Sequence, residues 1–370
     1  MKDSVLYKKV LGCLVGGACG DALGGPVEGM NANFIRQLHS GRVTEMVSYR
    51  TRPDDFFQPE MPSAYAWHDT PGTYTDDTYF SIQNALCIIQ KGGRINCEDL
   101  ADFWVKNFDV NRAWFSTANS YHKLELTHLP ARDVGEGTIG ENSSAMCIGP
   151  IGAINAGNPA QAAQDAYDVV SFMHWGHSRE AAAILAAAVA EAFNPDATVE
   201  SIMAAACDNI PNGKESRMYN ALHLGLDLAR KAKDSEELTQ LYYDQLIIDW
   251  TGRGMQPSGD GRHEASCEAQ ESIPCALGMI LNSKGDPRES IVSAANFGRD
   301  CDSIACMVGY VVGALHGIDG LPQSWVQAVM SANPEGPNLE ELAVQFTQTL
   351  EKQLQADSAR CQTVLGMAQA

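Results

Sequence analysis

An apolar segment near the N-terminus, residues 5–23, carries a glycine at every fourth position, and this row constrains the fold strongly. The glycines are Gly12, Gly16, Gly20 and Gly24. Residues four apart share one face of a helix, so the row predicts a core helix that another helix can approach closely. A second apolar segment, residues 303–316, also has small residues four apart, at Ala305, Gly309 and Gly313. We therefore expect both segments to be core helices, and we expect another helix to approach the first one closely.

Helix signals recur along the rest of the chain. Further helices are predicted for residues 78–90, 179–193, 217–233, 236–250, 287–297 and 339–353. Ser178 is expected to cap the second of these, and Pro287 takes the first helical position of another. Residues 31–74, rich in proline and aromatic residues, are expected to form a long loop with a small amount of local structure. The sequence shows no alternating strand pattern, phosphate-binding loop or internal repeat, so the predicted fold class is all-α.

The composition fits one large domain. The chain has 370 residues, of which 45% are hydrophobic and 19% charged. A chain of this kind can bury a sizeable core. We expect residues 1–335 to form a single all-α domain and residues 336–370 to form a C-terminal helical extension packed on it.

The net charge, the N-terminal sequence and the cysteines limit the partners and the compartment that we expect for this protein. Acidic residues outnumber basic ones by 46 to 26, for a formal charge of −20. No basic run is present, which argues against nucleic acid and anionic membranes. The N-terminus lacks a signal-peptide pattern, and the apolar stretch 304–315 would span only about 18 Å, so we expect a cytoplasmic protein without a transmembrane segment. The eleven cysteines include no CxxC pair, which favours free thiols over a disulfide frame or a zinc site.

Two short acidic clusters stand at predicted helix entrances, Thr75-Asp76-Asp77-Thr78 and Asp300-Cys301-Asp302-Ser303. One aspartate at each entrance is explained by helix capping. The second aspartate in each cluster is not. Two like charges 4 Å apart repel by roughly 4 kcal/mol at an effective dielectric of about 20, so four converging carboxylates would require cations or protons. If the fold brings the clusters together, they form a site for hard divalent cations.

Three ordered motifs resemble the ADP-ribosylglycohydrolase family, which includes the dinitrogenase reductase-activating glycohydrolases and crystallin J1. They are residues 12–28, the Thr-Asp-Asp-Thr cluster and residues 298–305. Weaker similarity covers residues 142–150 and 271–274. The resemblance extends from about residue 8 to about residue 325.

The resemblance implies a compact, orthogonal multi-helix domain with a binuclear centre of two divalent cations, Mg²⁺ or Mn²⁺, that hydrolyses a glycosidic bond at ribose C1. The implied metal ligands are Thr75, Asp76, Asp77, Asp300, Asp302 and Ser303. Glu28 matches the family's acidic residue on a mobile segment near the scissile bond. Our hypothesis is that Asp302 orients or deprotonates the attacking water and that Glu28 acts at the leaving group.

Substrate contacts are expected from five residues. Glu141, Asn142 and Ser143 match the region of the family's phosphate-binding loop, although glutamate and serine replace common glycines there. A glutamate beside a diphosphate would repel it, which weakens the expectation of diphosphate recognition. Trp175 either walls a nucleobase or belongs to the core. Arg299, which replaces a usual glycine, either neutralises the acidic pair or binds a substrate anion.

Three functions follow from this sequence. The first is a hydrolase that removes ADP-ribose from a protein side chain or a small acceptor. The second is a hydrolase of a simpler ribosyl N-glycoside that lacks the diphosphate. The third is a non-catalytic, ligand-binding or crystallin-like protein. The sequence leaves open the acceptor atom, the choice between magnesium and manganese, and the oligomeric state.

Overall fold

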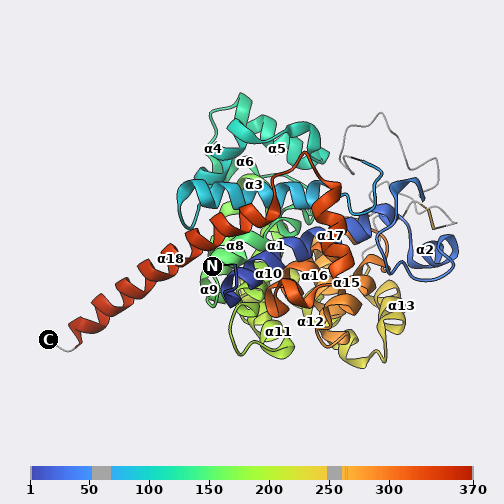
Figure 1. Cartoon of the computed structure of the whole chain (residues 1–370). Helices are drawn as coiled ribbons and strands as arrows, with labels where there is room; N and C mark the ends of the chain where they lie inside the picture. The colour runs from blue at the N-terminus through green and yellow to red at the C-terminus, as the bar shows by residue number, and fades with distance from the viewer. Residues whose placement is uncertain (1, 52–67, 248–260, 263, 265, 369–370) are drawn as a thin grey trace.

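The computed structural model describes residues 2–51, 68–247, 261, 262, 264 and 266–368. Its regular elements are helices, and the one β-bridge among these residues joins Asn31 to Gly298. The α-helices are α1 (Val5–Gly24), α2 (Ala32–Leu38), α3 (Asp76–Lys91), α4 (Cys97–Asn107), α5 (Phe115–Leu126), α6 (Ala131–Val134), α7 (Ser143–Met146), α8 (Gly149–Ile154), α9 (Pro159–Val169), α10 (His177–Ala192), α11 (Val199–Asp208), α12 (Arg217–Lys231), α13 (Ser235–Gln245), α14 (Ala269–Asn282), α15 (Pro287–Ala295), α16 (Cys301–His316), α17 (Gln323–Ala332) and α18 (Leu339–Met367). Short 3-10 turns are η1 (Gly25–Val27), η2 (Tyr49–Thr51), η3 (Val110–Arg112), η4 (Val170–Phe172), η5 (Gly213–Glu215) and η7 (Ile318–Gly320). The predicted all-α fold class is confirmed (Figure 1).

Helices α1 and α16 form the tightest pair in the core. A Cβ added at Gly20 of α1 would lie 1.9 Å from the carbonyl oxygen of Ala305, and one added at Gly16 would lie 2.3 Å from that of Gly309. Backbones this close leave no room for a side chain between them. The glycine row therefore has the close-packing role predicted for it, and its partner is the second row of small residues.

Helix α10 lies at the centre of the remaining helices, against α7, α8, α9, α11, α14 and α16. Its alanines are buried along most of its length, so neighbouring helices approach it from several sides. The predicted cap at Ser178 is wrong. Gly176 holds the cap position, and the Ser178 hydroxyl instead accepts a hydrogen bond of 2.9 Å from the backbone N–H of Glu141. A tertiary contact has replaced the local one.

Two other predicted segments differ from the structure. The segment predicted as a long loop contains α2, which Asn31 caps by accepting from the N–H of Phe34 at 2.8 Å; residues 52–67 lie outside the described chain. The helix predicted for residues 236–250 ends at Gln245 in α13, and residues 248–250 are outside the described range.

Helix α18 is longer than the predicted 339–353. Its first part is buried against α1, α3 and α8 through residues such as Leu342, Phe346 and Leu350. Arg94 then binds Asp357 through two hydrogen bonds of 3.1 and 2.6 Å. Beyond this point the helix is exposed and projects from the body of the molecule (Figure 1).

Residues 5–27 form the one stretch of described chain that is long and apolar enough to cross a membrane. All of its apolar window is buried inside the fold, which is the environment of a core helix.

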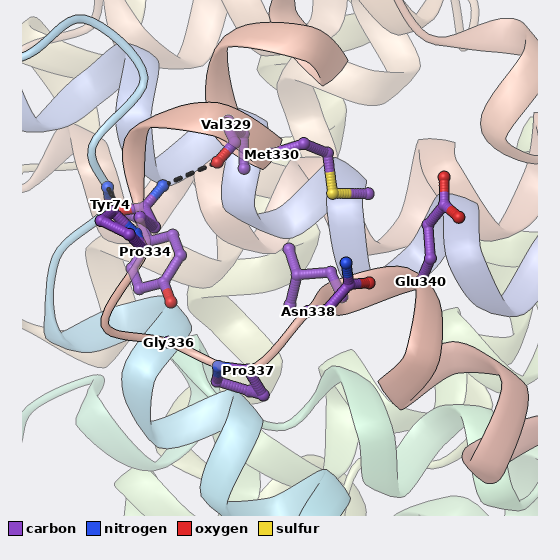
Figure 2. A pocket seen from close by; sticks show the side chains of 10 residues that line it. Tyr74, Val329, Met330, Pro334, Gly336, Pro337, Asn338 and Glu340 are labelled. Atoms are coloured by element: carbon purple, nitrogen blue, oxygen red, sulfur yellow. Dashed lines mark hydrogen bonds between the residues drawn. The ribbon is translucent and has the colours of Figure 1, made fainter.

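A cavity of about 300 Å³ lies where α17 turns into α18 (Figure 2). Its lining residues are Tyr74, Val329, Met330, Asn333, Pro334, Gly336, Pro337, Asn338, Leu339 and Glu340. Tyr74 immediately precedes the first acidic cluster, and its N–H donates to Asn333 at 3.1 Å. The lining includes no residue of either acidic cluster, so the cavity is separate from the site described below.

Candidate metal centre

The entrance of α3 is fixed by an aspartate from α1. Asp21 is fully buried and accepts from the backbone N–H of Thr75 at 3.0 Å and of Thr78 at 3.0 Å, and from the Thr78 hydroxyl at 2.5 Å. Burial raises the pKa of Asp21 to about 6 even though these hydrogen bonds act in the opposite direction. Asp21 therefore serves as an anchor for the first acidic cluster.

The carboxylates of Asp76 and Asp77 are not needed to cap helix α3. Thr75 is the N-cap residue, and its hydroxyl oxygen accepts from the N–H of Asp77 at 3.4 Å. Asp77 is buried and Asp76 is half-buried. Both therefore remain to act as ligands.

The second acidic cluster opens α16. Asp300 occupies the N-cap position, but its side chain makes no capping hydrogen bond. Its Oδ2 instead accepts from Asn142 Nδ2 at 2.5 Å. Asp302 follows in the first turn and lies beside the end of α1, where a Cβ added at Gly24 would be 2.5 Å from the Asp302 Cα. The α1–α16 contact thus places the second cluster next to the residues that lead to Glu28.

Glu28 follows η1 and completes a group of three acids. One carboxylate oxygen from each of Glu28, Asp300 and Asp302 lies within 4.8 Å of the others. This spacing suits a shared cation. Residues distant in the sequence therefore meet at one point.

The carboxyl pKa values show that the two acidic clusters share an electrostatic environment. Burial, followed by the charge of Asp302, raises the pKa of Asp77 well above its usual range. Burial and then Glu28 do the same to the pKa of Asp76. The pKa of Asp302 is raised by burial and Asp300, and that of Asp300 reaches about 8 because of burial and Glu28. The charge of Asp302 thus acts on Asp77, and the charge of Glu28 acts on both Asp76 and Asp300.

The donor set fits hard divalent cations. Asp77 Oδ1 and Asp302 Oδ1 are buried and have no hydrogen-bond partner among the described residues. Burying such an oxygen is costly unless a proton or cation satisfies it. All the candidate ligands are oxygens, the type that Mg²⁺ and Mn²⁺ prefer. Thr75 and Ser303, both buried, add hydroxyls at the two entrances.

The residues expected to bind substrate occupy different environments. Glu141 is fully buried, and its Oε1 lies 2.6 Å from His174 Nε2 and accepts from Ser143 Oγ at 3.0 Å. Burial would raise the pKa of Glu141, but His174 and these hydrogen bonds lower it overall. Asn142 is also buried and contacts Asp300, as described above. Trp175 is 49% exposed, so it is not a core residue.

Arg299 is buried, and its guanidinium faces Glu271. Its Nε donates to Glu271 Oε1 at 2.6 Å and its Nη2 donates to Oε2 at 3.2 Å. Glu264 lies 3.9 Å away. The charge of Arg299 is therefore paired with Glu271, an arrangement different from either role that the sequence suggested for it.

Sequence reasoning missed two parts of the site. The first is the contact from Asn142 to Asp300, which no local pattern indicates. The second is Arg112 in η3, a buried cation whose pKa is lowered by burial and raised again by Asp76. Arg112 lies in a segment without a motif, so nothing in the sequence indicated that its charge interacts with that of Asp76.

Comparison with known proteins identifies the family to which this arrangement belongs. Residues 2–356 match the ADP-ribosylglycohydrolase family. The chain belongs to this family. ADP-ribosylglycohydrolases are glycosidic hydrolases, and this chain is therefore an enzyme of that type. Both expectations from the sequence, the family and the enzyme class, are confirmed.

Individual relatives are distant. The uncharacterized protein YegU of Escherichia coli K12 is 23% identical over 333 residues, covering 85% of this chain and 89% of YegU. An uncharacterized protein of Archaeoglobus fulgidus is 25% identical over 358 residues, covering 92% and 96%. The ADP-ribosylarginine hydrolase Tri1 of Pseudomonas putida GB-1 is 32% identical over 108 residues, only 29% of each chain.

A solved structure described as an ADP-ribosylglycohydrolase-related protein complex shares the fold. It aligns with a TM-score of 0.63 at 21% identity, covering 94% of this chain and 98% of the other. This similarity supports the all-α architecture across nearly the whole chain.

Proposed function

We propose that this ADP-ribosylglycohydrolase family member is a metal-dependent hydrolase of the glycosidic bond at ribose C1. The observation that carries the proposal is the convergence of Glu28, Asp300 and Asp302 within 4.8 Å beside the buried Asp77, whose Oδ1 lacks a hydrogen-bond partner in the described chain. A solely structural acidic cluster would be destabilised by this repulsion. A cation-binding role explains it.

The ligands would come from the two helix entrances, with Thr75, Asp76 and Asp77 on one side and Asp300, Asp302 and Ser303 on the other. Two divalent cations, Mg²⁺ or Mn²⁺, when bound, would supply Lewis acidity that lowers the pKa of a water and holds the ribose hydroxyls. Asp302 orients that water and takes its proton. Glu28, which is half-buried, acts at the leaving group.

The default substrate is an ADP-ribosylated protein side chain or small acceptor. Family membership and the partial similarity to an ADP-ribosylarginine hydrolase support this class. The pairing of Glu141 with His174 adds support, because a buried and compensated carboxylate repels a diphosphate less than a free one. Trp175, half exposed beside His174, is proposed to wall the nucleobase.

We also propose a compartment and a domain organisation. The eleven cysteines are free thiols, which supports the cytoplasm as the compartment. The buried first part of α18 supports the view that residues 1–335 form one domain and that residues 336–370 form an extension whose first part packs on it.

A substrate panel tests the proposed function. Purified protein is incubated with ADP-ribosylated arginine, an ADP-ribosyl-serine peptide and a set of nucleosides, each with Mg²⁺, with Mn²⁺ or with chelator. We expect release of ADP-ribose that requires metal. Release of free ribose from nucleosides alone would instead support the simpler N-glycoside. No turnover with any substrate would support the non-catalytic function.

A further inference from the structure

The backbone around Arg299 is held in an unfavourable conformation. Arg299 has φ of 61° and follows Gly298 with φ of 79°. A residue with a side chain costs about 1 kcal/mol or more in this left-handed region, whereas glycine does not. The structure around Arg299 must therefore make interactions that offset this cost.

The backbone of Arg299 is hydrogen-bonded to the segment that follows Glu28. Arg299 N–H donates to the carbonyl oxygen of Met30 at 2.6 Å, and Gly29 N–H donates to the carbonyl oxygen of Arg299 at 2.6 Å. These reciprocal bonds place the residue after Glu28 beside the residue before Asp300. The position of Glu28 relative to the second acidic cluster is set here.

The Arg299 side chain adds, through Glu264, further contacts to the segment that follows Glu28. Glu271, which is fully buried, accepts hydrogen bonds from two nitrogens of the guanidinium. The nearby Glu264 accepts from Asn31 Nδ2 at 2.9 Å, and its N–H donates to the carbonyl oxygen of Gly29 at 2.7 Å. The guanidinium therefore joins α14 and Glu264 to the chain on the C-terminal side of Glu28.

We propose that Arg299 is a positioning residue that fixes the segment carrying Glu28 against the acidic centre, acting through Glu271 and Glu264. The proposal rests on the role of Glu28 given under the proposed function. It differs from both roles suggested by the sequence, since the guanidinium is paired with Glu271. In this chain the segment is locked by a buried ion pair.

The substitution Arg299→Gly tests the proposal cleanly, because glycine accepts the same backbone angles and only the side-chain contacts are lost. Lys284→Gly is the matched control, since Lys284 is exposed and has φ of 56°. Arg299→Lys keeps the charge but lacks the two-pronged fork. Amide hydrogen exchange of Gly29 and Asn31, Mn²⁺ affinity by electron paramagnetic resonance, and kcat and KM are measured for each.

For Arg299→Gly we expect at least tenfold faster exchange of the Gly29 amide, roughly tenfold weaker Mn²⁺ binding and a lower kcat, in line with the usual effect of losing a support behind a metal ligand. Arg299→Lys should fall between Arg299→Gly and wild type, and Lys284→Gly should match wild type in all three. Unchanged exchange and unchanged Mn²⁺ affinity in Arg299→Gly would overturn the proposal.

The outcome for Glu28 is separable from the outcome for Arg299. If Glu28→Gln retains full turnover while Arg299→Gly still accelerates exchange, the proposed catalytic role of Glu28 fails and the positioning role of Arg299 stands. If Glu28→Gln loses turnover while Arg299→Gly changes neither exchange nor Mn²⁺ binding, the reverse holds. Adding Glu271→Gln to Arg299→Gly should not accelerate exchange further, because both side chains act through one contact; an additive effect would contradict the proposal.

Discussion

Asp300→Asn should stabilise the protein when metal is absent and abolish its stabilisation by metal. The pKa of Asp300 is raised from 3.8 to about 8 by burial and by Glu28. The folded state therefore keeps a proton that the unfolded state releases above about pH 4. Stability is greatest below that pH and falls as the pH rises toward 8, where both states are ionised.

The size of this effect follows from the shift. For one carboxyl of this kind, each pH unit between 4 and 7 lowers the free energy of unfolding by about 1.4 kcal/mol, which amounts to up to about 4 kcal/mol in total. Asparagine carries no charge to repel Glu28 and keeps an oxygen that can accept from Asn142. Metal-free Asp300→Asn should therefore be more stable than wild type by about 1 to 4 kcal/mol at pH 7.

Urea unfolding in chelator, Mg²⁺ or Mn²⁺ at pH 5 and pH 8 measures these differences. Wild type in chelator should lose stability between pH 5 and pH 8 and regain it when metal is added. Asp300→Asn should show a smaller loss and little response to metal. The exposed Asp208→Asn serves as the control. If the stability of wild type in chelator does not fall as the pH rises, or if Asp300→Asn is less stable than wild type in chelator, then Asp300 does not destabilise the metal-free protein as expected.

Three more predictions test other parts of the structure. Asp302→Asn and Glu28→Gln should each lower kcat by about 10²-fold or more at saturating metal, and full turnover of Asp302→Asn with metal bound would contradict its role at the water. Gly20→Val should prevent folding or lower the free energy of unfolding, measured by circular dichroism melting, by about 3 kcal/mol or more, because its Cβ would lie 1.9 Å from the Ala305 oxygen. Gly366 has open space around it, so Gly366→Val should have a free energy of unfolding within about 1 kcal/mol of wild type. Removal of residues 358–370 should change the free energy of unfolding by less than about 1 kcal/mol, since this part of the chain is exposed as far as it is described; a large loss would show that these residues support the core.

The glycine row shows what sequence alone can establish. Its spacing predicted a close helix contact, and the structure confirms one. The partner could not be derived from that spacing, because several helices in the chain carry small residues. The fold was needed to show that α16 lies against α1 and thereby brings Asp302 toward Glu28.

Local rules failed where a tertiary contact competed with them. Ser178 has the residue type of a helix cap, but it binds the N–H of Glu141. Glu141 pairs with the buried His174, a partner that no local pattern indicates. For Arg299 the replacement of a common glycine was visible in the sequence, but its positive φ and its partner Glu271 were not. In each case a long-range partner decided the role of the side chain.

A crystal structure of the protein grown in Mn²⁺ would show whether the acidic residues form a metal centre. We expect anomalous peaks for two ions between the carboxylates of Asp76 and Asp77 and those of Asp300 and Asp302, and we expect these peaks to disappear when the crystals are soaked in chelator. Absence of anomalous density between these side chains at saturating Mn²⁺ would show that they do not form a metal centre.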